Sequence, residues 1–137
     1  MSAASNYLEN KLLDHTLKVA AFTQPTNLYL GLYNNTSGLT AANLESGILT
    51  DETSTSGTAY VRKAVAFGAA SGGTAATNAT VTFDTATLSW GTITHIAVLD
   101  NVTGGNVLFW GAVTVSKLID VGDTFQVSVG NLTITLA

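Results

Sequence analysis

The chain has 137 residues, of which 46% are apolar and only 10% charged, and its formal net charge is −4. One domain of this length buries about two-thirds of the surface of its unfolded chain, so a hydrophobic core is feasible. Five basic residues and no cysteine argue against phosphate-binding cation clusters and exclude disulfides and thiolate zinc sites.

Residues 5–22 show the amphipathic pattern of a surface helix. Asn6 is a suitable N-cap residue, and Glu9 follows three residues later in the capping-box position. Apolar and polar side chains each cover about half of the helix circumference. The apolar half contains Leu8, Leu12, Leu13, Leu17, Val19 and Ala20. Because Pro25 ends this pattern, we expect an N-terminal helical arm over residues 1–22.

A strand is predicted directly after the proline, in the stretch TNLYLGLY. Leu28, Leu30 and Leu32 alternate there with Tyr29 and Tyr33. This period of two places successive side chains on opposite faces of a sheet. We expect the leucines to face the core.

Residues 34–59 form a long segment rich in serine, threonine, asparagine and glycine. Segments of more than about 15 residues without regular structure are uncommon in compact domains. The middle part, LTAANLESGIL, is compatible with a short helical turn. Two interpretations stay open: an arm that packs on a neighbouring subunit, which would explain its leucines and isoleucine, or a solvated, flexible loop.

The next two strands are predicted in YVRKAVAFGAA and TVTFDTA, with a glycine-containing turn between them. Val61, Val65 and Phe67 fall on one side of the first strand. Val81 and Phe83 are expected to face inward from the second. Both strands therefore have one core-facing side.

The stretch Ser89–Val113 contains both tryptophans and predicts a β-hairpin, because the apolar runs TITHIAVLD and NVLFWGAV are joined by NVTGG. Neither run alternates cleanly. The first places Ile93, Ala97 and Leu99 on one face and Ile96 and Val98 on the other. A strand that is apolar on both faces is covered on both. We expect the core on one face and the N-terminal helix or another protein chain on the other.

The C-terminal stretch TFQVSVGNLTITLA predicts a second hairpin, with Gly130 and Asn131 as a two-residue turn. This turn would pair Val129 with Leu132, Val127 with Ile134 and Phe125 with Leu136, all on one face. The whole pattern predicts a mainly β fold: an antiparallel β-sandwich of about seven or eight strands with one N-terminal amphipathic helix and a long loop. We expect a single domain over residues 1–137, with the arm at 1–22 and the sandwich at 23–137.

Few residues are available for catalysis or metal binding. The two histidines are His15, on the polar face of the predicted helix, and His95, within a predicted strand, whereas a hydrolytic triad needs a nucleophile, a histidine and an acid together. Asp100, Asp120 and Asp123 lack the alternating spacing of a calcium loop. We predict no catalytic residue, no metal site, no cofactor and no small-molecule substrate.

The sequence also argues against several kinds of partner and location. The acidic balance argues against nucleic acid, no stretch approaches the ~20 apolar residues that span a bilayer, and the N-terminus lacks the pattern of a secretory signal. Carbohydrate binding is a competing interpretation, because Tyr29, Tyr33, Trp90 and Trp110 offer rings on which a sugar could stack. Large aromatics in or beside strands are more often packing residues.

Several motifs together resemble a family of small virion proteins of tailed bacteriophages, labelled either tail fibre proteins or capsid decoration (cement) proteins. These motifs are NYLENKLLDHTL, PTNLYLGLY, YVRKAVAF, SWGTITHIAVLD, GGNVLFWGAV and GDTFQVSVGNLTITL. The resemblance covers almost the whole chain and implies a non-enzymatic structural protein that assembles in the host cytoplasm. The segment 34–59 looks variable.

The favoured interpretation is a cement protein on the capsid surface, with the major capsid protein and copies of itself, as a homotrimer, for partners. The chain has no repeat or heptad pattern that would build a fibre shaft, and permanent interfaces are more apolar than transient ones. Predicted oligomer or capsid contacts are Leu8, Leu12, Ile96, Val98, Leu108 and Trp110. The alternative is a tail fibre or baseplate protein that binds a host-surface glycan or receptor, with possible glycan contacts at Tyr29, Tyr33 and Trp90.

Overall fold

The computed structural model describes residues 3–136; residues 1–2 of the predicted arm and residue 137 lie outside the described residues. Over the described range the fold is mainly β, as predicted, with nine short strands in antiparallel sheets and two short helices. The first helix, α1 (Asn6–Thr16), is the predicted one, and α2 (Thr40–Glu45) lies in the long segment 34–59.

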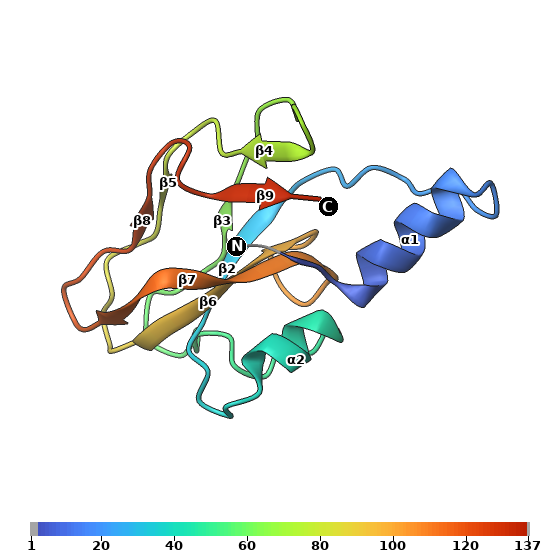
Figure 1. Cartoon of the computed structure of the whole chain (residues 1–137). Coiled ribbons are helices and arrows are strands. Elements are labelled where there is room, and N and C mark those ends of the chain that lie inside the picture. Colours follow the sequence, from blue (N-terminus) through green and yellow to red (C-terminus); the bar gives the residue numbers. More distant parts are fainter. Residues whose placement is uncertain (1–2, 137) are drawn as a thin grey trace.

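A five-stranded sheet forms the centre of the molecule, and two small sheets lie beside it (Figure 1). The order in the large sheet is β1 (Ala3–Ala4), β7 (Val107–Ile119), β6 (Gly91–Leu99), β2 (Tyr29–Tyr33) and β3 (Lys63–Ala64). The small sheets pair β4 (Thr74–Ala76) with β9 (Thr133–Thr135) and β5 (Val81–Thr82) with β8 (Gln126–Val127). Figure 1 shows the small sheets on one side of the large sheet and α2 on the other.

The predicted hairpin of β6 and β7 is confirmed and provides the two longest strands. Its loop closes around the Asp100 carboxylate, which accepts hydrogen bonds from the backbone N–H of Asn106 (2.7 Å) and from its side-chain amide (2.9 Å). Gly105 has φ +73°, and a Cβ there would lie 2.6 Å from Asp100 Oδ1. The glycine-rich stretch is therefore required by the tight packing of this turn.

Two register shifts interrupt the hairpin. Ile93 is opposite Lys117, whereas His95 is opposite Ala112, so the residues between Lys117 and Ala112 bulge out of the ladder. A bulge changes which face a side chain occupies. Ile93 therefore packs in the main core, while Ala97 and Leu99 pack in the second cluster. The prediction that Ile93 shares a face with Ala97 and Leu99 was wrong.

The main core lies between the large sheet and the small sheets and is centred on aromatic rings. Tyr60 stacks on Phe83 at 6.1 Å and meets the edge of Trp90 at 5.4 Å, and Phe83 also contacts Phe125. This core contains four residues that were predicted to face inward: Leu30, Leu32, Val81 and Phe83. Val61, which was predicted to share the inward side with Val65 and Phe67, is instead 45% exposed.

The second cluster covers the opposite face of β6 and β7, and here the sequence prediction was wrong about the covering element. Neither the N-terminal helix nor another chain is needed, because α2 supplies the cover. Leu44 of α2 is fully buried with Tyr33, Leu99 and Val107. The segment 34–59 is thus not a loose loop: the short predicted helical turn packs on its own sheet.

The helix α1 begins one residue earlier, and ends sooner, than predicted. Ser5 is the N-cap: its hydroxyl accepts a hydrogen bond from the Leu8 N–H and donates to the Val107 carbonyl. The helix ends at Thr16 because Lys18 adopts φ +68° and the Val19 N–H returns to the Asp14 carbonyl, which is the arrangement of a Schellman cap. Leu8 is the helix's buried residue, and Figure 1 shows α1 projecting from the body.

The predicted C-terminal hairpin does not form. A turn does occur at Gly130, with the Asn131 N–H bonded to the Ser128 carbonyl. The strands on either side then separate, because β8 pairs with β5 and β9 pairs with β4. An alternating pattern shows that a segment fits a half-buried strand but does not specify the partner strand.

Candidate interaction surface

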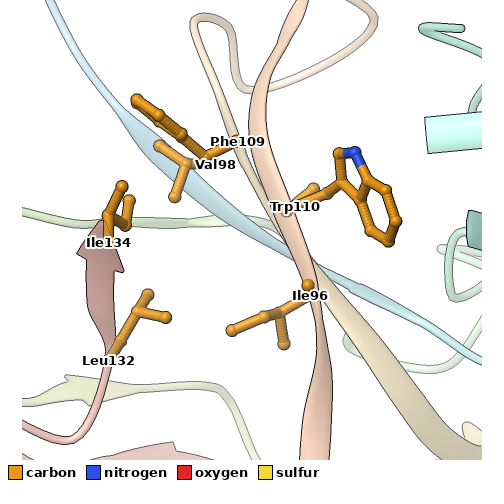
Figure 2. A pocket seen from close by; sticks show the side chains of 8 residues that line it. Ile96, Val98, Phe109, Trp110, Leu132 and Ile134 are labelled. Atoms are coloured by element: carbon orange, nitrogen blue, oxygen red, sulfur yellow. The ribbon is translucent and has the colours of Figure 1, made fainter. Parts of the chain in front are cut away.

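A hollow of about 260 Å³ lies between the large sheet and the C-terminal strand, and we call it the β7–β9 hollow. Its lining is almost entirely apolar. The lining residues include Leu28, Phe67, Ala75, Val98, Leu108, Phe109, Ile134 and Leu136. Figure 2 shows a smaller pocket beside it, where Ile96, Val98 and Phe109 from the sheet lie toward Leu132 and Ile134 from the C-terminal segment.

The second register shift of the hairpin explains the shape of this hollow. Val98 pairs with Phe109 and Leu99 pairs with Val107, so Leu108 is an extra residue in β7. Leu108 and Phe109 both line the hollow, although adjacent residues of a regular strand point to opposite faces. The strand β9 is hydrogen-bonded to β4 and not to the large sheet, so this side remains open.

A second apolar feature lies on residues 6–19, the projecting helix α1 and the turn that follows it, which we call the α1 arm. Leu13, Leu17 and Val19 are 56%, 69% and 75% exposed. Leu17 is the C-cap residue of α1 and follows Leu13 by four residues, which places the two side chains on one side of the arm. Exposed apolar side chains that are grouped in this way mark interaction sites more often than isolated ones do.

A buried ion pair holds three separate segments together beneath the hairpin loop. Arg62 Nη2 lies 2.7 Å from Glu52 Oε2, and the Arg62 side chain is 3% exposed. Arg62 Nη1 also donates to the carbonyls of Asn101 (2.7 Å) and Gly104 (2.8 Å), and the Tyr33 hydroxyl donates to Glu52. Burial and the nearby Glu52 carboxylate raise the pKa of Tyr33, so its hydroxyl stays protonated. The sequence did not identify Arg62 as a buried residue. It is adjacent to Lys63 in the chain, and no pattern there indicates that one of the two is buried.

The long segment 34–59 is organised around a buried carboxylate, that of Asp51. The Ser37 hydroxyl donates to Asp51 Oδ2 at 2.6 Å, the Ser37 N–H donates to Oδ1 at 3.1 Å, and the Thr40 hydroxyl at the start of α2 also donates to Oδ2. Burial alone would raise the pKa of Asp51, but the hydrogen bonds from Ser37 and Thr40 outweigh it and hold this pKa below its usual value.

We expect Asp51→Asn to lower the free energy of unfolding by about 2 kcal/mol at neutral pH, because hydrogen bonds to a charged acceptor are lost. A carboxyl whose pKa is lowered by folding stabilises the fold above its unfolded pKa, near ~4, and loses this contribution as the pH falls. Urea denaturation at several pH values tests this. The wild type should lose more stability than Asp51→Asn between about pH 5 and pH 3, and equal losses would contradict the assignment. Asp120→Asn, at an exposed position, is the control.

The candidate catalytic and metal-binding residues are not brought together. His15 Nδ1 accepts the Phe22 N–H at 3.0 Å, and His95 Nδ1 shares a hydrogen bond with the neighbouring Thr94 hydroxyl. Partial burial lowers the pKa of His95, and Asp51 opposes this effect. Asp123 accepts the Asp120 N–H within its own turn. Across residues 3–136, no three histidine or acidic side chains converge to hold a metal ion.

The residues predicted as contacts are distributed over both faces of the sheet. Val98 and Leu108 line the β7–β9 hollow and Ile96 lines the smaller pocket beside it, while the Trp110 ring points to the other side of β7 and donates to Glu45 of α2 at 2.7 Å. Leu8 is buried against the body and Leu12 is half-buried. The sequence could not reveal the matching wall of the hollow, because Ile134 and Leu136 were assigned to a hairpin that does not form.

Two of the four rings considered for sugar stacking are buried inside the protein. Tyr33 is fully buried, and Trp90 is 3% exposed and donates from Nε1 to the Thr58 carbonyl. Tyr29 is half-buried. No sugar ring can stack on Tyr33 or Trp90 in this fold.

The family model described as "Podophage GP4 fiber I protein gp80" matches residues 3–135. No curated protein matches the chain. Neither helix in the described part of the chain is long and apolar enough to cross a membrane.

Proposed function

The chain belongs to the family of the podophage GP4 fiber I protein gp80, and from this premise we propose that it builds a structural segment of the phage tail fibre. As a member of this family it is a non-enzymatic structural protein of the virion. The observation that carries the proposal is the extent of the match, which includes all the strands and both helices. The fibre assignment thus applies to the whole fold and not to an appended segment.

This proposal replaces the cement interpretation favoured by the sequence. The family match supports the tail fibre alternative better than attachment to the outside of the capsid, and it gives no support to the major capsid protein as a partner. The lack of a shaft-forming repeat, which argued for cement, is compatible with a fibre that is assembled from compact β-domains.

Two features of the surface support an assembly role within the fibre. The β7–β9 hollow is apolar, and the α1 arm exposes Leu13 and Leu17. Lasting protein interfaces are richer in apolar surface than transient ones. We propose that the chain forms a homo-oligomer in the fibre; the homotrimer predicted from the sequence belonged to the cement interpretation, which this proposal replaces. We assign no glycan contact to Tyr33 or Trp90, because their rings are buried.

The number of copies per virion tests the fibre assignment. Quantitative mass spectrometry of purified particles should give a few to a few tens of copies, measured against the major capsid protein as an internal standard. Hundreds of copies in a simple ratio to the shell subunit would instead indicate a lattice component and contradict the proposal.

A further inference from the structure

We propose that the α1 arm of one copy docks into the β7–β9 hollow of a second copy. This inference names the partner of the apolar surfaces and rests on the proposed function for its place in the fibre. It is carried by the two complementary parts of one chain: a projecting apolar arm and an open apolar hollow.

Within the described residues, the base of the arm is its buried part. Ser5 and Leu8 anchor it, the former through hydrogen bonds to the carbonyls of Val107 and Leu108. Beyond this base the helix extends away from the sheet (Figure 1), and Leu13, Leu17 and Val19 remain more than half exposed. In the part of the chain that the structure describes, no helix or strand covers these three side chains.

The hollow has the matching chemistry. Its floor is formed by buried Val98, Leu108 and Ile134, and Leu136 at its rim is 52% exposed. Among residues 3–136, no charged side chain lines it, so leucine and valine side chains can enter without displacing a charge from water. Its volume of about 260 Å³ is enough for apolar side chains from the arm but small for an additional folded element.

The position of the arm's base favours a second copy over an unrelated partner. Leu108 lines the hollow, and its carbonyl accepts the Ser5 N–H at 2.9 Å, so each arm starts beside its own hollow. When one arm enters a partner's hollow, the partner's arm is therefore brought near the first copy's hollow. A reciprocal exchange buries both arms and closes the contact, as in isologous interfaces.

The absence of cysteine from the chain allows a direct test by single-cysteine crosslinking. Leu17→Cys is placed in one chain and Leu136→Cys in a chain with a different affinity tag, and the two proteins are mixed under mild oxidation. We expect a disulfide between the two tagged chains. The matched control replaces Leu136→Cys by Val129→Cys, at a residue of similar exposure (57%) that does not line the hollow. Equal crosslinking to both sites would overturn the proposal.

A second measurement uses exposed positions, where substitutions should leave the fold intact. Sedimentation of Leu13→Asp/Leu17→Asp should show self-association weakened at least tenfold, while Val129→Asp should associate as the wild type does. Unchanged association of the arm variant, or a wild-type protein that remains monomeric at all concentrations, would overturn the proposal. So would an internal disulfide in a monomer carrying both Leu17→Cys and Leu136→Cys, because the arm would then fill its own hollow.

These results are separable from the fibre assignment. A chain found at the tail without the intermolecular crosslink keeps the fibre assignment and loses the arm exchange. A chain that crosslinks as expected but occurs in hundreds of copies per particle keeps the exchange and loses the fibre assignment.

Discussion

Arg62→Ala is expected to lower the free energy of unfolding by about 3–5 kcal/mol, the usual result of removing one partner from a buried ion pair. The substitution leaves the Glu52 carboxylate, 17% exposed, without its cation. It also leaves the carbonyls of Asn101 and Gly104 without a donor. The hairpin loop and the long segment 34–59 then lose their shared anchor.

Urea denaturation followed by circular dichroism measures this loss. Lys63→Ala is the matched control, because Lys63 pairs with Asp84 at 2.9 Å on a more exposed surface, where such pairs contribute about 0–1 kcal/mol. An Arg62→Ala midpoint equal to that of Lys63→Ala would show that the buried pair does not organise the fold. Combining Arg62→Met with Glu52→Gln should recover part of the loss, because no charge is then left unpaired.

Trp90→Ala is also expected to have a large effect, lowering the free energy of unfolding by about 3–5 kcal/mol. The ring is 3% exposed, it contacts Tyr60 at 5.4 Å, and its Nε1–H donates to the Thr58 carbonyl at 2.8 Å. The substitution therefore creates a cavity and leaves a buried acceptor unpaired.

Trp110→Ala is the comparison, because this ring is only half-buried and faces α2. We expect it to cost about 1–2 kcal/mol, less than the ~3–5 kcal/mol that a buried ring at that position would imply. Thermal or urea unfolding of the two variants in parallel measures the difference. A larger loss for Trp110→Ala than for Trp90→Ala would contradict the assignment of Trp90 to the main core.

The parts of the fold that depend on local pattern could be predicted from the sequence. Alternation identified Leu30 and Leu32 as inward residues, and the glycine-rich NVTGG stretch identified the central hairpin. The end of α1 could not be predicted, since the left-handed residue of its cap is Lys18, where glycine is usual. Pro25 gave a stop signal, but the chain leaves the helix well before it.

Features that depend on which distant strands pair, and in which register, could not be predicted from the sequence. The bulge opposite Thr94 changes the face of Ile93, and no residue in that stretch marks it. The alternation around Gly130 fits a hairpin as well as it fits two strands that pair elsewhere. Only one side of the candidate site could therefore be predicted. Val98 and Leu108 were predicted as contacts, but Ile134 and Leu136 form the opposite wall, whose position depends on the pairing of β9 with β4.

The most direct test of the fibre assignment is the position of the protein on the particle. Antibodies against the purified chain, coupled to gold and imaged by electron microscopy on intact virions, should label the fibres at the tail. Label distributed over the surface of the head, with none at the tail, would contradict the assignment and return the protein to the capsid.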